Sequence, residues 1–186
     1  MLAAQDTLLI PPQEALKNAQ KATLQKYPDA DSVILADCEK NVCNKDGTYK
    51  MWHEVYEKVL TEKGKREGKT ISFDYTLPYE TVEIKLVEII KPDGRKIPVD
   101  IAKNSKTAVD SSQMGMNIYN PNDKVLQLAL PGLEIGDIIH YVSLSDTVKT
   151  RVPDTWSNYG IFEGHSPILY ASMTADRPKE LPLVNI

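Results

Sequence analysis

The sequence has few of the residue types that usually mark a chemical function. It contains two cysteines, three histidines and two phenylalanines among 186 residues. Two cysteines cannot form the disulfide framework of a small secreted scaffold. Cys38 and Cys43 lie in one expected strand, which separates their Cα atoms by about 16 Å, whereas a disulfide needs about 7 Å or less. We therefore expect two free thiols, and cysteine usage does not identify a cellular compartment.

Long hydrophobic runs and an excess of positive charge are also missing. No apolar segment approaches the ~18 residues of a membrane span. The chain has 22 Lys and Arg against 26 Asp and Glu, a net charge of −4, which gives no electrostatic reason to bind DNA, RNA or an anionic membrane. The remaining composition, 41% hydrophobic and 26% charged, is typical of a globular chain. The length favours one main domain.

The hydrophobic pattern changes period once along the chain. Residues 13–26 follow a helical period behind Pro11 and Pro12, and Pro28 ends that pattern. After it come short alternating or apolar runs separated by turns such as Asp46-Gly47. The expected strands cover 32–44, 49–60, 70–75, 82–90, 96–100, 125–130, 138–144 and 166–174, with irregular crossings at 61–69 and 104–122. This arrangement predicts an all-β fold, an antiparallel β-sandwich with one short N-terminal helix.

Three parts of the chain are expected to differ in role. Residues 1–27 form an N-terminal segment with the helix, and 28–176 form the sandwich domain. Residues 177–186 contain two prolines and are typical of a linker towards a downstream domain. The first six residues are similar to the small-residue tail of a secretory signal, or are an ordinary frayed terminus.

Two short motifs come close to known reactive sites and fail. The segment 64–70 (GKREGKT) is one residue too short for a phosphate-binding loop and precedes a strand pattern. The segment 53–57 (HEVYE) lacks the second histidine of a zinc-protease motif. On a strand its ends lie about 13 Å apart, too far to share a metal ion. We expect no catalytic residue, no metal ligand and no cofactor.

A cysteine nucleophile is the enzymatic alternative. Cys38 lies between Asp37 and Glu39, which disfavours the thiolate that such chemistry needs. A standalone hydrolase would pair Cys38 or Cys43 with one of the histidines, and the sequence does not show which residues meet in space. The histidines are His53, His140 and His165.

Aromatic and polar residues gather in a loop between the last two expected strands. Trp156, Asn158, Tyr159 and His165 are the candidate binding residues. Loop aromatics are suited to contact a glycan or a peptide. The competing interpretation is that Trp156 packs against one end of the sandwich.

Several turn and strand segments occur in a characteristic order. They are 27–35 (YPDADSVIL), the Asp46-Gly47 turn with the strand running to 60–64 (LTEKG), 91–97 (KPDGRKI), 130–139 (LPGLEIGDII), and finally Trp156 and Pro167. Over residues 27–174, this order resembles the β-domain of unknown function that precedes transglutaminase-like cores in secreted Gram-negative bacterial proteins.

The resemblance implies an antiparallel β-sandwich, export to the periplasm or cell surface, and an adjacent transglutaminase-like Cys-His-Asp core in the same polypeptide. No catalytic residue transfers to this chain, because the segment that holds the triad has no counterpart in it. We expect a non-catalytic accessory domain that positions the catalytic core. The alternative is an independent glycan- or peptide-binding β-sandwich module.

Overall fold

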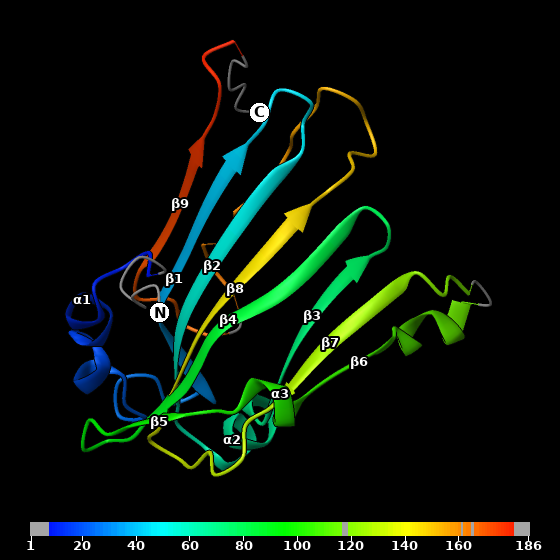
Figure 1. The fold of residues 1–186 in the computed structure, drawn as a ribbon. Helices are drawn as coiled ribbons and strands as arrows, with labels where there is room; N and C mark the ends of the chain where they lie inside the picture. The colour runs from blue at the N-terminus through cyan, green and yellow to red at the C-terminus, as the bar shows by residue number, and fades with distance from the viewer. Residues whose placement is uncertain (1–7, 117–118, 161, 165, 181–186) are drawn as a thin grey trace.

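Two β-sheets make up most of the molecule (Figure 1). The computed structural model describes residues 8–116, 119–160, 162–164 and 166–180. A six-stranded sheet has the order β5-β4-β8-β2-β1-β9, and a three-stranded sheet has the order β3-β7-β6. The strands are β1 (Ser32–Cys43), β2 (Tyr49–Val59), β3 (Thr70–Thr76), β4 (Glu80–Ile90), β5 (Lys96–Pro98), β6 (Ser105–Val109), β7 (Asp123–Ala129), β8 (Ile138–Thr147) and β9 (Ala171–Asp176). The α-helices are α1 (Pro12–Leu16), α2 (Glu62–Gly68) and α3 (Ile101–Asn104).

Antiparallel pairing dominates both sheets. The neighbours β1–β2, β2–β8, β4–β8 and β4–β5, and both pairs of the smaller sheet, are antiparallel. The one exception is β9, which lies parallel to β1 from Asp37↔Ala171 to Val42↔Asp176. The β1–β2 hairpin closes at Gly47, whose φ of +81° suits glycine. The predicted all-β sandwich with a short N-terminal helix is therefore confirmed.

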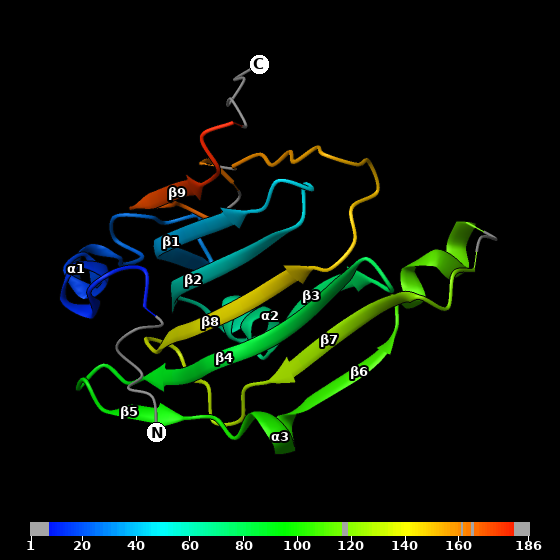
Figure 2. The ribbon, with the colours of Figure 1, turned by 45° about the horizontal axis from the view of Figure 1, so that its top comes forward.

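The six-stranded sheet has a hydrophobic cluster on each of its faces, since consecutive side chains of a strand point to opposite sides. On the face that we call the outer face, the N-terminal segment packs Ile10 and Ala22 into one cluster with Ile138. On the inner face, Ile139 joins a second cluster with Leu128 of the smaller sheet. The smaller sheet lies towards the β4–β8 side, and α1 lies towards β1 and β2 (Figures 1 and 2).

The helix expected over 13–26 is wrong in extent. It consists of α1 and a separate 3₁₀ helix at Ala19–Lys21. A short amphipathic helix gains most of its stability from packing rather than propensity, and here a tertiary contact competes with it. The Lys58 ammonium donates to the Ala19 carbonyl over 2.9 Å, while Ala22 is turned into the core.

Two segments expected to be irregular contain regular structure. Residues 62–68 form α2, whose N-cap Thr61 accepts a hydrogen bond from the Gly64 N–H. Residues 104–122 include β6 and a 3₁₀ helix at Ser111–Met116. The Gly-Lys-Thr of 68–70 therefore begins at the last residue of a helix, whereas a phosphate-binding loop precedes one.

The last strand also differs from the expectation. It runs over Ala171–Asp176 and adds to the sheet edge, whereas residues 166–170 lie outside the strand and contact β1 through a bridge from Ile168 to Ile34. In the described part of the chain, no helix is long and apolar enough to span a bilayer.

Candidate functional site

The described loop residues among the sequence candidates have different surroundings. Trp156 is half-buried and meets the Tyr49 ring edge-on, with the ring centroids 6.2 Å apart. The Asn158 amide donates to the Glu39 carboxylate over 2.6 Å, which ties the loop to β1. Tyr159 is 79% exposed. His165 lies outside the described residues.

Both cysteines are poor candidates for a nucleophile. Cys38 and Cys43 are free thiols buried in the sheet. Burial raises the pKa of the Cys38 thiol, and the carboxylates of Glu54 and Asp37 raise it further, although a hydrogen bond with Ser172 opposes them. Burial and the nearby Asp176 likewise raise the pKa of Cys43. The reactive thiolate is disfavoured at both positions.

A charged cluster lies buried on the outer face. His140 is fully buried between two carboxylates, with Nε2 2.9 Å from Glu54 Oε1 and Nδ1 2.8 Å from Glu88 Oε1. Its ring stacks on Tyr56 at a centroid distance of 3.8 Å, and Lys96 lies 2.7 Å from Glu88. Burial alone would lower the pKa of His140, but the two carboxylates raise it.

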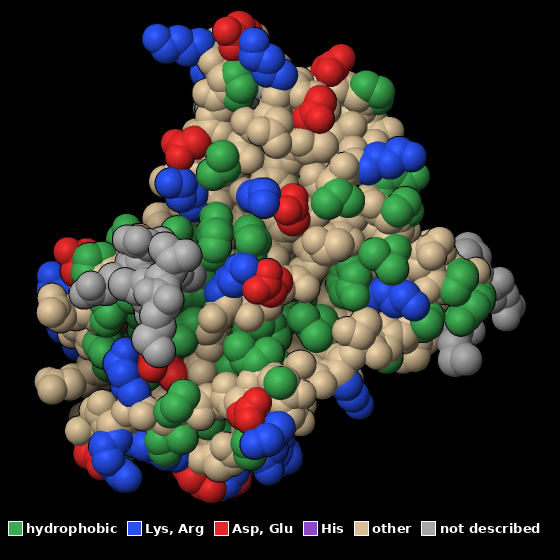
Figure 3. Space-filling view, in the orientation of Figure 1, with side chains coloured by type: hydrophobic (Ala, Val, Ile, Leu, Met, Phe, Trp, Pro, Cys, Tyr) green, Lys and Arg blue, Asp and Glu red, His purple; other side chains and the backbone are tan. Residues whose placement is uncertain are grey.

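This cluster ties the N-terminal segment to the sheet. The backbone N–H groups of Leu9 and Ile10 donate to the second oxygen of Glu54. No histidine is visible on the face that the space-filling view shows (Figure 3). On that face, charged side chains are dispersed and hydrophobic ones gather near the centre. Because both nitrogens of His140 and both oxygens of Glu54 are paired inside the protein, the cluster has a structural role.

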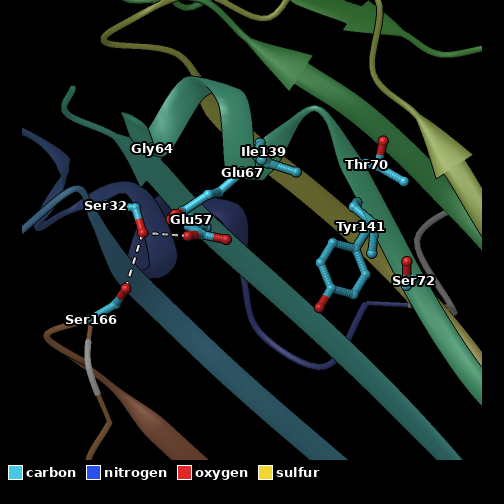
Figure 4. A pocket seen from close by; sticks show the side chains of 11 residues that line it. Ser32, Glu57, Gly64, Glu67, Thr70, Ser72, Ile139, Tyr141 and Ser166 are labelled. Carbon is cyan, nitrogen blue, oxygen red and sulfur yellow. Dashed lines mark hydrogen bonds between the residues drawn. The ribbon is translucent and has the colours of Figure 1, made fainter. Parts of the chain in front are cut away.

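A groove on the inner face is the candidate site. Its pocket has a volume of ≈310 Å³ and is bounded by β1, β2, β8, α2, β3 and the segment before β9 (Figure 4). Ser32 donates to the Glu57 carboxylate and lies 3.0 Å from the Ser166 hydroxyl. The lining residues are Ser32, Glu57, Gly64, Glu67, Gly68, Thr70, Ile71, Ser72, Ile139, Tyr141 and Ser166.

The groove has a negative floor. Glu57 is half-buried and, within the described residues, makes no salt bridge. Burial raises the pKa of the Tyr141 phenol, and the carboxylates of Asp37 and Glu57 raise it further, so Tyr141 stays protonated and can donate a hydrogen bond. Next to Tyr141, His53 meets its ring edge-on and lies 2.7 Å from Asp37.

These groups favour binding over catalysis. Nucleophilic catalysis needs a hydroxyl or thiol within hydrogen-bond reach of a base. His53 is bonded to Asp37, and in the described part of the chain it has no hydroxyl or thiol partner. Ser32 does have a base within reach, but that base is the Glu57 carboxylate, and a carboxylate is ordinarily a weaker base than an imidazole. No group of three or more potential metal ligands occurs among the described residues. A half-buried carboxylate with nearby hydroxyl donors is suited to hold a cation or an amine.

Comparison with known proteins places the fold in context. A protein of Parabacteroides distasonis ATCC 8503 that is named "putative protease" has a similar structure, with a TM-score of 0.67 at 13% identity. The similarity covers 82% of this chain and 30% of that chain, so this chain spans less than a third of that protein. A family 3a carbohydrate-binding module from the scaffoldin cipA of Clostridium thermocellum gives a TM-score of 0.35 at 15% identity, over 64% of this chain and 69% of that chain.

No curated protein matches the sequence. The family described as a domain of unknown function with a solved structure, DUF3857, matches residues 45–184, most of the chain. The matched range contains β2 to β9 and every wall of the groove except β1. The chain therefore belongs to the DUF3857 family.

Proposed function

We propose that this chain is a non-catalytic accessory domain of a larger, exported transglutaminase-like or protease-like protein. It packs beside the catalytic core and positions it. The observation that carries the proposal is the unequal coverage of the structural match, 82% of this chain against 30% of the protein named as a protease. The same fold thus occurs as one part of a longer polypeptide. The transglutaminase-like context and the export rest on the resemblance of the segments 91–97 and 130–139.

The chemistry of the chain supports a positional role. Both thiols are buried, and His53 has a carboxylate partner instead of a nucleophile. Aromatic side chains near the final strand are exposed and could contact a neighbouring domain, because such rings contribute large apolar area to interfaces. They are Tyr159, Phe162 and Tyr170.

The first prediction concerns activity. This chain alone should neither hydrolyse a peptide nor incorporate an amine into a glutamine-containing protein. The polypeptide of the complete reading frame should do one of the two. Deleting the part that corresponds to this chain should lower kcat/KM about tenfold, a usual size for coupling between packed domains. Fluorogenic peptide hydrolysis and dansylcadaverine incorporation measure both reactions. Activity in this chain alone, or a reading frame with no catalytic core, would contradict the proposal.

A second candidate function is an independent glycan- or peptide-binding module. The specific observation in its favour is Tyr159, which is 79% exposed on a loop that the Asn158–Glu39 bond fixes to β1. Exposed aromatic rings are suited to stack on sugars or contact peptides.

The second prediction tests this candidate. Binding on a glycan or peptide array should weaken about fivefold in Tyr159→Ala, because one stacked ring contributes roughly 1 kcal/mol. Tyr119→Ala is the matched control, since Tyr119 is 66% exposed on a different loop. An array with no signal, or equal losses in both variants, would count against the candidate.

A further inference from the structure

One edge of β3 has no strand partner in the described part of the chain. The three-stranded sheet has the order β3-β7-β6, so β7 pairs with only one side of β3. The Lys69 carbonyl accepts from the Leu130 N–H over 2.9 Å, and the Leu77 N–H donates to the Asn122 carbonyl over 2.9 Å. The odd-numbered residues of β3 therefore point their backbone N–H and C=O groups towards β7. The even-numbered residues of β3, such as Ser72, point theirs towards the free edge.

The free edge of β3 borders the groove. Thr70, Ile71 and Ser72 line the same pocket as Glu57 of β2 and Tyr141 of β8 (Figure 4). The opposite wall is the segment before β9, which is fixed to β1 through the bonds Asn158–Glu39 and Ser166–Ser32. The inner-face cluster contains no residue of β1 or β9, so the smaller sheet leaves this part of the larger sheet uncovered.

An extended polypeptide beside β3 would complete the smaller sheet over the groove. Its backbone would pair with even-numbered residues of β3, and every second side chain would point to the floor. The floor presents Glu57, which has no salt bridge within the described residues, and the Asp37 carboxylate beyond it. The rim adds the exposed Glu67.

We propose that the groove binds an extended polypeptide segment with a basic side chain, which adds to the free edge of β3 and places its ammonium or guanidinium group against Glu57. Ser32 orients this carboxylate by donating to it. Tyr141 presents its protonated hydroxyl beside the same position. This site lies apart from the exposed loop residue Tyr159, and it does not depend on a neighbouring catalytic domain.

The charge requirement can be tested with two labelled peptides. A fluorescein-labelled heptapeptide of alternating threonine and lysine should bind this chain in an anisotropy titration, with an affinity that falls as salt rises. The same peptide with glutamate in place of lysine should bind at least tenfold more weakly. Glu57→Gln should weaken the lysine peptide about tenfold, because the charge pair is partly desolvated. Glu83→Gln, which removes an exposed carboxylate of β4 outside the groove, is the matched control and should change nothing.

The strand pairing can be tested at Ser72. The variant Ser72→Pro removes a backbone N–H from the free edge and keeps the hydrogen bonds to β7, so it should weaken the lysine peptide at least tenfold. Ser72→Ala keeps that N–H and should bind like the parent chain. Thermal unfolding and the amide spectrum confirm that both variants fold. The proposal would be overturned if the lysine and glutamate peptides bound with equal affinity, or if the lysine peptide did not bind at ~1 mM. It would also be overturned if a folded Ser72→Pro variant bound the lysine peptide as tightly as the parent chain.

Discussion

Replacing His140 with leucine is expected to lower the free energy of unfolding by about 3–5 kcal/mol, the usual cost of removing one partner from a buried ion cluster. The imidazole lies between Glu54 and Glu88, and all three side chains are buried. Without the histidine, two carboxylates would face each other inside the sheet. One of them would have to take up a proton or the N-terminal segment would have to open to water.

Urea unfolding followed by tryptophan fluorescence measures this loss. The matched control is His53→Leu, because His53 also pairs with a carboxylate but its side chain is 26% exposed. Partly exposed pairs contribute only about 0–1 kcal/mol. Similar losses in the two variants would show that His140 is not the centre of a buried charged cluster.

The same cluster should make stability depend on pH. The two carboxylates hold the pKa of His140 above its ordinary value of 6.5 despite burial. The contribution of His140 to the free energy of unfolding is therefore complete below pH 6.5. It is lost as the pH rises through the raised pKa of the folded state. Burial would raise the pKa of Glu88, but the bonds from His140 and Lys96 lower it below 4.5. The contribution of Glu88 to the free energy of unfolding is therefore present above pH 4.5, and it is lost as the pH falls through the lowered pKa of the folded state. The unfolding free energy should fall above pH 6.5 in the parent chain and change less there in His140→Leu.

Local pattern was enough to predict every strand except β6, and most of their bounds. The turn at Asp46-Gly47 and the alternation in residues 49–60 depend on neighbours in the sequence, and both were correct within a residue or two. Helix α2 was missed because the charged residues 61–69 carry no apolar period. Its N-terminal end is fixed by distant contacts instead, since the Asp31 carbonyl accepts from the N–H groups of Leu60 and Thr61.

Neither charged site could be found from the sequence, because both need the order of the strands. The buried cluster joins β2, β8 and β4, and β4 and β8 are separated in the sequence by β5, β6 and β7. The parity of Glu54 and Tyr56 did place both on one face of β2. It could not show that His140 would lie opposite Tyr56. The groove likewise joins Ser32, Glu57 and Ser166 from distant segments, while Trp156 and Tyr159, which are close in sequence, have different surroundings.

The variant Gly64→Ala is expected to lower the free energy of unfolding by about 2 kcal/mol, although alanine normally stabilises a helix by about 1 kcal/mol relative to glycine. A Cβ atom at position 64 would lie 2.2 Å from the Asp31 carbonyl oxygen. This oxygen is backbone and already accepts from Leu60 and Thr61, so it cannot move away without loss of both bonds. The control is Gly115→Ala, where the added atom meets open space and where the change should be below about 0.5 kcal/mol.

The position of α2 also links this substitution to the groove. Gly64, Glu67 and Gly68 all line the pocket, and the Thr61 cap fixes the start of the helix beside β1. If the clash moves α2 away from Asp31, the end of the groove should widen, and the lysine peptide should bind more weakly to Gly64→Ala under conditions where the variant is still folded. Urea unfolding and peptide anisotropy on the same samples separate the two effects. An unfolding free energy equal to that of Gly115→Ala would mean that α2 is not seated on Asp31. A large loss of stability with unchanged peptide affinity would mean that the helix is not a wall of the binding groove.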